Sequence, residues 1–281
     1  MKLIFDLIRS VLFGIVEGIT EWLPVSSTGH LILLEEFIRF ESVSEGFWSM
    51  FEVVIQLGAI LAVLVIFWRK IWPFSKKGEV LGIIKRDKLM LWCKILVACI
   101  PAAVVGLLFD DLIDALFYNP VTVGIMLILV GIAFIVLEKR HKGKRAQVET
   151  LEDISFQSAF GIGLFQLVAA ILPGTSRSGS TILGGLMLGV SRTAAAEFTF
   201  FLAIPVMFGA SLLKVVKFGL AFTASELLIL LVGMVAAFAV SMLCIRFLMD
   251  YIKRHDFAVF GWYRIVLGVV VLGYFAVKAL V

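Results

Sequence analysis

Long apolar stretches alternate with short polar connections along almost the whole chain. Six of these stretches are long enough to cross a membrane as helices, which takes about 20 apolar residues each. They cover about 47–68, 89–109, 120–138, 197–217, 225–247 and 259–280. The pattern therefore predicts an all-α integral membrane protein with about six full transmembrane helices.

Two further apolar stretches, about 5–38 and 155–191, are interrupted near their middle by a proline followed by small polar residues. The halves are too short to cross a membrane separately. Non-helical backbone at membrane depth is tolerated only inside protein or against a water-filled cavity. We therefore expect each stretch to form a re-entrant helix–loop–helix hairpin.

The composition supports a membrane protein. Of the 281 residues, 61% are hydrophobic and 16% are charged, whereas soluble domains average about 45–50% and about 25%. The net charge of +4 suits topology control better than nucleic-acid binding, because Lys and Arg lie in short connections between apolar stretches. The three cysteines lie inside apolar stretches and have no spacing typical of a metal site or a disulfide framework.

The charges of the connections predict an orientation. The connections 69–88, 139–145 and 253–255 are basic, while 41–45 and 110–119 are acidic. The positive-inside rule assigns the basic connections to the cytoplasm and the acidic ones to the outside. The first hairpin then enters the membrane from outside and the second from inside.

This antisymmetry predicts an inverted-topology repeat within a single membrane domain, 1–281, with halves of about 1–145 and 146–281. A weak internal match supports it. The matching positions are Phe-Gly-Ile at 13–15 and 160–162, Leu-Pro at 23–24 and 172–173, and Glu17 opposite Gln166. In such an architecture the two broken hairpins meet near the middle of the membrane.

The second break, P-G-T-S-R-S-G-S-T at 173–181, has the features of an anion site. Pro173 and Gly174 stop one helix, and the N-terminus of the next offers free N–H groups and a positive dipole end. Arg177 adds a planar charged fork that suits phosphate oxygens. The alternative is a break of small residues that only helps helices to pack. The candidate phosphate-binding residues are Gly174, Thr175, Ser176, Arg177, Ser178 and Thr181, with Ser26 and Thr28 from the first break.

The first break, E-G-I-T-E-W-L-P-V-S-S-T-G-H at 17–30, contains the groups for catalysis. Ser27 and His30 are three residues apart, so they can share a face of a helix, and a hydroxyl beside an imidazole is a minimal activated nucleophile. His30 could instead attack phosphorus itself or protonate a leaving group. The candidate catalytic residues are Glu17, Glu21, Ser27 and His30, together with Arg177.

Glu17 and Glu21 are four residues apart and share a helix face. Two carboxylates would repel a phosphate unless Mg²⁺ or Ca²⁺ bridges them, so we predict that both are metal ligands. The alternative is that they carry protons, as in a transporter. Arg264 near the start of the last apolar stretch suits a headgroup anchor as well as a site residue.

These motifs, with F-E-V-V-I-Q-L-G-A-I-L-A-V at 51–63 and G-V-S-R-T-A-A-A-E-F at 189–198, resemble the bacterial undecaprenyl-diphosphate phosphatases of the bacitracin-resistance type. The resemblance covers almost the whole chain. It implies an enzyme that removes the terminal phosphate of undecaprenyl diphosphate and so recycles the lipid carrier for cell-wall synthesis. It also implies a divalent cation, bacitracin resistance, and a location in the bacterial cytoplasmic membrane with the site open to the outer face. By matching position, the functional residues it implies are Glu17, Glu21, Ser27, His30, Ser176, Arg177 and Thr181.

The resulting mechanistic hypothesis has Ser27, deprotonated by His30, attack the terminal phosphorus, with His30 and water as alternative nucleophiles. The rival from another class is a transporter or lipid flippase on the same scaffold, which needs an anion site but no nucleophile. Lipid phosphatases of the acid-phosphatase type are disfavoured because they need a second catalytic histidine, and His141 and His255 lie in basic connections. The expected partners are a polyprenyl diphosphate, membrane lipids and, as an open alternative, a second copy of the chain in a homodimer. Nucleic acid is not expected.

Overall fold

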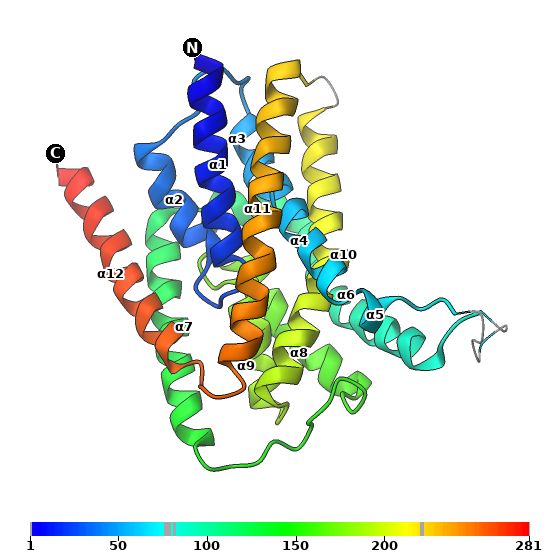
Figure 1. The fold of residues 1–281 in the computed structure, drawn as a ribbon. Coiled ribbons are helices and arrows are strands. Elements are labelled where there is room, and N and C mark those ends of the chain that lie inside the picture. Colours follow the sequence, from blue (N-terminus) through cyan, green and yellow to red (C-terminus); the bar gives the residue numbers. More distant parts are fainter. Residues whose placement is uncertain (1, 76–79, 81–82, 220–221, 281) are drawn as a thin grey trace.

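The fold is a bundle of helices, seen here in a computed structural model that describes residues 2–75, 80, 83–219 and 222–280 (Figure 1). Within those residues the only β structure is a few isolated bridges. The helices are α1 (Lys2–Thr20), α2 (Ser27–Phe37), α3 (Phe47–Val54), α4 (Gln56–Ile66), α5 (Trp68–Ile71), α6 (Arg86–Phe117), α7 (Pro120–His141), α8 (Phe156–Ile171), α9 (Arg177–Met187), α10 (Arg192–Phe218), α11 (Ala224–Tyr251) and α12 (Ala258–Leu280).

Six spans among the described residues are long and apolar enough to cross a membrane, as the sequence predicts. Five are the helices α6, α7, α10, α11 and α12, and the sixth is α3 with α4, Phe47–Ile66. The break between α3 and α4 is slight, because Ile55 keeps the right-handed helical conformation (φ −58°, ψ −27°). The protein is therefore a multi-pass membrane protein.

The predicted connection at 110–119 is wrong in extent. Helix α6 continues to Phe117, because no glycine or proline occurs between Gly106 and Asn119. There the Asn119 side chain accepts a hydrogen bond from the Thr122 N–H (2.9 Å) and begins α7. In the basic connection 69–88, Lys76 and Lys77 lie outside the described residues.

The two interrupted segments have the same local structure. Ser26 precedes α2 and Ser176 precedes α9, and both have positive φ (75° and 67°). Each serine Oγ accepts a hydrogen bond from the N–H three residues later, of Gly29 (3.4 Å) and Gly179 (3.2 Å). A non-glycine residue in this region costs about 1–3 kcal/mol, which surrounding structure must offset. The equivalence supports the internal match; re-entry of the hairpins into a membrane stays a prediction.

Helices α7 and α12 pack backbone to backbone along a seam of glycines. A Cβ on Gly131 would lie 2.6 Å from the carbonyl oxygen of Gly261, and one on Gly261 would lie 2.7 Å from that of Gly131. Two helical turns away, a Cβ on Gly268 would lie 2.7 Å from the Gly124 carbonyl oxygen. Small residues at helix interfaces allow this close approach in membranes. The seam therefore fixes the position of α12.

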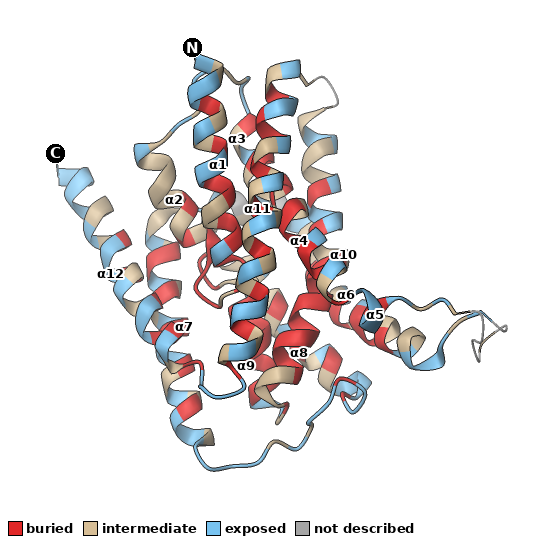
Figure 2. Cartoon of the chain, viewed as in Figure 1, coloured by how far each residue is buried: buried red, intermediate tan, exposed pale blue. Residues whose placement is uncertain are grey.

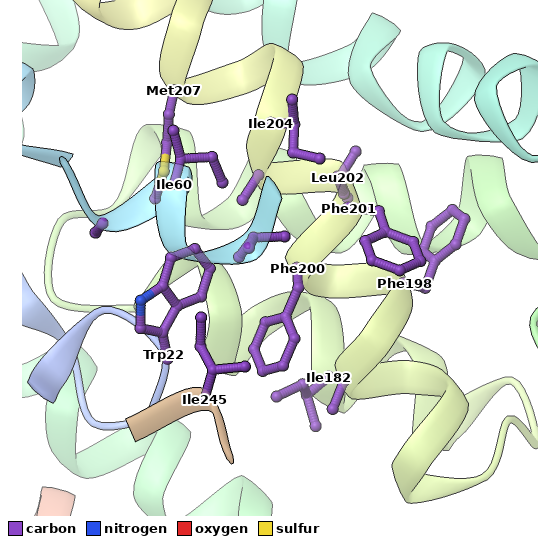
Figure 3. Packing of buried hydrophobic residues seen from close by; sticks show 14 of the residues in the cluster. Trp22, Ile60, Ile182, Phe198, Phe200, Phe201, Leu202, Ile204, Met207 and Ile245 are labelled. Atoms are coloured by element: carbon purple, nitrogen blue, oxygen red, sulfur yellow. The ribbon is translucent and has the colours of Figure 1, made fainter. Parts of the chain in front are cut away.

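Buried residues concentrate at mid-height, where α4, α8, α9 and α10 surround the two breaks, while α12 is largely exposed (Figure 2). Trp22, which follows Glu21, is fully buried in this core. Its ring meets Phe200 of α10 edge to face, with centroids 5.3 Å apart (Figure 3). Such aromatic pairs contribute about 0.5–1.5 kcal/mol beyond their burial. The packing of Trp22 thus anchors the first break against α10.

Candidate active site

The two polar motifs contact each other directly across the molecule. Arg177 at the start of α9 forms an ion pair with Glu21, with Nη2 and Oε1 3.0 Å apart. The neighbouring Ser178 hydroxyl donates to the backbone carbonyl of Glu21 at 3.0 Å. The sequence-based expectation that the breaks lie opposite each other is therefore confirmed (Figure 1).

A serine, a carboxylate and a guanidinium form a continuous chain at this contact. Ser27 Oγ donates a hydrogen bond of 2.8 Å to Glu21 Oε2, while the other oxygen of Glu21 accepts from Arg177. Ser27 and Glu21 are both buried, and hydrogen bonds strengthen where the local dielectric is low. A carboxylate that already accepts the hydroxyl proton is placed to act as its general base.

Arg177 is held in place but keeps one donor free. Its Nη1 donates to the carbonyl oxygen of Thr199 in α10 at 3.0 Å. Its Nε is buried and has no hydrogen-bond partner within the described residues. Because the guanidinium also lies at the N-terminus of α9, both the free N–H and the helix dipole favour an anion here.

His30 does not contact Ser27 in the way the sequence predicted. Its Nδ1 lies 2.7 Å from the Ser26 carbonyl oxygen, and its Nε2 lies 2.7 Å from the Tyr263 hydroxyl. A carbonyl can only accept, so Nδ1 is the protonated nitrogen and Nε2 accepts from Tyr263. The spacing placed Ser27 and His30 near each other, but partners on another helix decide where the imidazole points. The expected Ser27–His30 pair is thus replaced by Ser27–Glu21.

The predicted phosphate ligands of α9 are largely used within the protein. Ser178 bonds to Glu21, and the Thr181 hydroxyl donates to the Arg177 carbonyl at 2.9 Å. Thr199 donates in turn to Thr181 Oγ1 at 2.8 Å. These two side chains brace the start of α9 and connect it to α10.

The loop residues just before the helices keep more capacity for a ligand. The hydroxyl of Thr175 is buried without a hydrogen-bond partner among the described residues, and Thr28 is half-buried. Gly174 has φ +89°, and a Cβ there would lie 2.5 Å from the Val123 carbonyl oxygen. Only glycine fits at that position, so the loop needs Gly174 to pass this close to the backbone of α7.

Glu17 lies next to this chain without being part of it. Its carboxylate is fully buried, and neither oxygen has a hydrogen-bond partner within the described residues. Gln166, the matching position of the second half, is buried and unpaired in the same way. A buried carboxylate without a partner is costly unless a proton or a cation neutralises it. Glu17 therefore marks a place for one of these.

The donor set suits a cation that the substrate helps to bind. In the part of the chain that the structure describes, no three His, Cys, Asp or Glu side chains are grouped to hold a metal ion. Mg²⁺ is commonly bound by one or two carboxylates plus phosphate oxygens and water. The unpaired oxygens of Glu17, with Glu21 one helical turn away, fit that pattern.

The residue that joins the two breaks, Arg264, is not among the predicted site residues. Arg264 of α12 is fully buried and donates to the carbonyl oxygen of Pro24 in the first break at 3.2 Å. It also donates to those of Gly174 (2.8 Å) and Thr175 (2.9 Å) in the second. The only sequence signal was a charged residue within an apolar stretch. Tyr263, the partner of His30, precedes it and had no signal in the sequence.

Replacing Arg264 by lysine should loosen the site. A point charge cannot reproduce the fork that reaches both breaks, and each buried carbonyl left unpaired costs about 1–3 kcal/mol. We expect a lower thermal unfolding midpoint in detergent and a loss of activity of about tenfold or more. The matched control is Arg246→Lys, at an exposed arginine of α11. Equal behaviour of the two variants would show that the cross-link is unimportant.

The fold and the site define a class of protein: a multi-pass helical membrane protein whose buried polar site is built from two opposed helix breaks. The family model described as Bacitracin resistance protein BacA matches residues 10–270, and the chain belongs to this family.

Curated relatives resemble the chain over nearly their full length. An undecaprenyl-diphosphatase of Desulfitobacterium hafniense is 60% identical over 276 residues, which is 98% of both chains. One from Enterococcus faecalis is 59% identical over 267 residues, covering 95% of this chain and 96% of the relative. One from Streptococcus mutans is 57% identical over 281 residues, covering 99% of each.

Proposed function

We propose that this protein is an undecaprenyl-diphosphate phosphatase, which hydrolyses undecaprenyl diphosphate to undecaprenyl phosphate and inorganic phosphate. The names of its relatives support the reaction. The observation that carries the chemistry is the hydrogen-bonded chain from Ser27 through Glu21 to Arg177. In the cell, the activity recycles the lipid carrier for cell-wall synthesis and confers bacitracin resistance.

In the proposed first step, Ser27 Oγ attacks the terminal phosphorus and its proton passes to Glu21. The bond between that phosphorus and the bridging oxygen breaks, and undecaprenyl phosphate leaves. Glu21 gives this proton to the departing undecaprenyl phosphate and is ionised again. In the second step, water attacks the phosphorus of the phosphoserine and the bond from phosphorus to Ser27 Oγ breaks. Glu21 accepts a proton from the water and returns it to Ser27 Oγ, and inorganic phosphate is released. Ser27 is preferred as nucleophile because its hydroxyl, unlike the His30 ring, already bonds to a carboxylate.

The charge of the reacting phosphate is met by groups that are fixed before it arrives. The free Nε–H of Arg177 and the N-terminus of α9 both belong to the second break. Donors that are held in place stabilise developing charge without reorganisation, which is how most phosphoryl-transfer enzymes gain rate. His30, whose Nδ1–H donates to the Ser26 carbonyl and whose Nε2 accepts from Tyr263, orients the tyrosine hydroxyl at the edge of the site.

Glu17 and Glu21 are the residues that would hold a Mg²⁺ or Ca²⁺ ion. When bound, such a cation would neutralise the diphosphate and the carboxylates. This assignment is supported by the two unpaired oxygens of Glu17. The protein's own contribution at this point is to keep a dry, negatively charged position beside the arginine.

The same proposal puts the protein in the bacterial cytoplasmic membrane, as a monomer or a homodimer, with its site open to the outer face. The basic stretch 139–145 comprises the last turn of α7 and the start of the connection after it, and the stretch 253–255 lies in the connection after α11. Both lie at the end of the molecule opposite the N-terminus (Figure 1). This grouping is what the positive-inside rule requires.

The proposal is tested by phosphate release from undecaprenyl diphosphate with purified protein in detergent, before and after EDTA treatment. We expect release that EDTA abolishes and that Mg²⁺ or Ca²⁺ restores, because two carboxylates otherwise repel the substrate. Release that EDTA leaves unchanged would mean that Glu17 and Glu21 carry protons rather than bind a metal ion. Absence of release from well-folded protein would favour a transporter.

A further inference from the structure

An apolar cavity of about 320 Å³ lies between α6, α8 and α10, outside the catalytic groups. Its lining includes Gly106, Ala170 and Gly209, and it has no charged residue. Both long helices carry an internal proline near it, Pro101 in α6 and Pro205 in α10. Proline bends a helix and small residues leave space beside it. The small residues of α6, α8 and α10 and the prolines of α6 and α10 therefore account for the cavity.

One end of the cavity adjoins the phosphate site. Ala170 of α8, which lines the cavity, is the next-to-last residue of the helix that ends at the second break. Helix α10 contacts the arginine of that break through the Thr199 carbonyl. Two helical turns beyond Thr199, Val206 lines the cavity, and from Cys99 the lining continues along the same face to Gly106. The apolar path thus begins beside the second break, two helical turns along α10 from the carbonyl that holds Arg177.

The other end of the cavity leads away from the basic connections and opens on the side of the molecule. Its most buried lining residue is Ala102, and it extends along α6 to Ile113 and along α10 to Leu213. Leu107 at its rim is 73% exposed, and Gly209 is also exposed. In a bilayer this face meets lipid chains, so a lipid enters sideways without crossing water.

We propose that this cavity holds the prenyl chain of the diphosphate substrate, beginning with the isoprene units next to the diphosphate. The inference rests on the proposed function. The occupant is a prenyl chain because one apolar cavity leads to the helix break that carries Arg177, which matches a single chain with a terminal diphosphate. A membrane phospholipid has two chains and a glycerol between them and its phosphate. The small residues leave room for the methyl branches.

The cavity acts by positioning rather than by hydrophobic transfer. The chain arrives from a bilayer that is as apolar as the cavity, so burial removes little surface from water. What it gains is van der Waals contact and a fixed path that brings the diphosphate to Ser27 and Arg177 in one orientation. Blocking the path should therefore harm a long substrate and spare one that has almost no chain.

The experiment uses Gly209→Leu, which should fill the cavity. A Cβ at Gly209 has no heavy atom within 4 Å, so leucine is accommodated without moving the backbone. Gly273→Leu is the matched control, because Gly273 is likewise exposed on a helix with nothing within 4 Å, and it lies on α12 away from the cavity. For each protein, kcat/KM is measured with undecaprenyl diphosphate in micelles and with dimethylallyl diphosphate in solution.

We expect the ratio of the two kcat/KM values to fall by about tenfold or more in Gly209→Leu, the scale at which a pocket rejects a misfit chain. The ratio should stay unchanged in Gly273→Leu. An unchanged ratio in Gly209→Leu would overturn the inference and give the cavity to an ordinary acyl chain. An equal loss with both substrates would also overturn it, because the effect would then be structural.

A second measurement separates this inference from the proposed function. A photoreactive farnesyl diphosphate analogue should label wild-type peptides around 99–113 and 205–213, and the labelling should be lost in Gly209→Leu. If the wild type releases no phosphate but is labelled there, the proposed reaction fails and the chain site stands. If it releases phosphate but is labelled elsewhere, the reaction stands and the chain site is wrong.

Discussion

Alanine at Ser27 is expected to lower kcat for phosphate release by about 10³-fold or more, the scale of losing a catalytic nucleophile. The reason is geometric: the Ser27 hydroxyl alone in the first break donates to a carboxylate, at 2.8 Å from Glu21 Oε2. Without it, no covalent intermediate forms, and water would have to attack from an unprepared position. The fold should survive, because only one hydrogen bond is removed.

The measurement combines turnover with trapping of the intermediate. Substrate labelled at the terminal phosphate, quenched in acid, should leave label on Ser27 in the wild type and none in Ser27→Ala. Ser211→Ala is the matched control, since Ser211 is a buried serine with one hydrogen bond to a backbone carbonyl, that of Val53. Near-normal turnover in Ser27→Ala would assign the nucleophile to His30 or water.

Glutamine at Glu21 is expected to lower kcat by about 10²–10⁴-fold, the contribution typical of a general base. The amide keeps the size of the side chain and one accepting oxygen, so Ser27 or Arg177 can still bond to it. It cannot take the serine proton, and it removes the charge that pairs with Arg177. The loss should appear in kcat more than in KM, because the proton transfer occurs in the transition state.

The control for this variant is Glu36→Gln. Glu36 is also a carboxylate paired with a basic residue, Lys278, but it lies outside the site. We expect near wild-type turnover there. If Glu21→Gln stayed within tenfold of wild type while Ser27→Ala was inactive, the serine proton would have to go elsewhere, and His30 would regain that role.

The sequence predicted the parts of this fold that depend on local pattern. Apolar length predicted the six spans, and proline followed by small polar residues predicted the two breaks. The match of Leu-Pro at 23–24 with 172–173 predicted that the breaks are equivalent, which the positive φ of Ser26 and Ser176 supports. Each of these signals lies within a short segment of the chain, and the formation and the interruption of a helix depend on such short segments.

The sequence did not predict the orientation of individual side chains. Spacing of three residues places Ser27 and His30 on one helix face, but neighbours on other helices decide which partner each one finds. Tyr263, which is 233 residues from His30 in the sequence, forms a hydrogen bond with the imidazole. Thr181 has the right chemistry for phosphate and is used instead to bond within α9 and to α10. The sequence pattern identifies the chemical groups, and tertiary contacts determine which partner each group binds.

Arg264 has a consequence for the order in which the protein matures. Its helix, α12, is synthesised after the segments that contain both breaks, and domains and helices assemble as the chain emerges. Until α12 has inserted and its glycines have met those of α7, the carbonyls of Pro24, Gly174 and Thr175 lack their shared donor. We therefore expect the site to reach its final geometry only when the last helix has inserted.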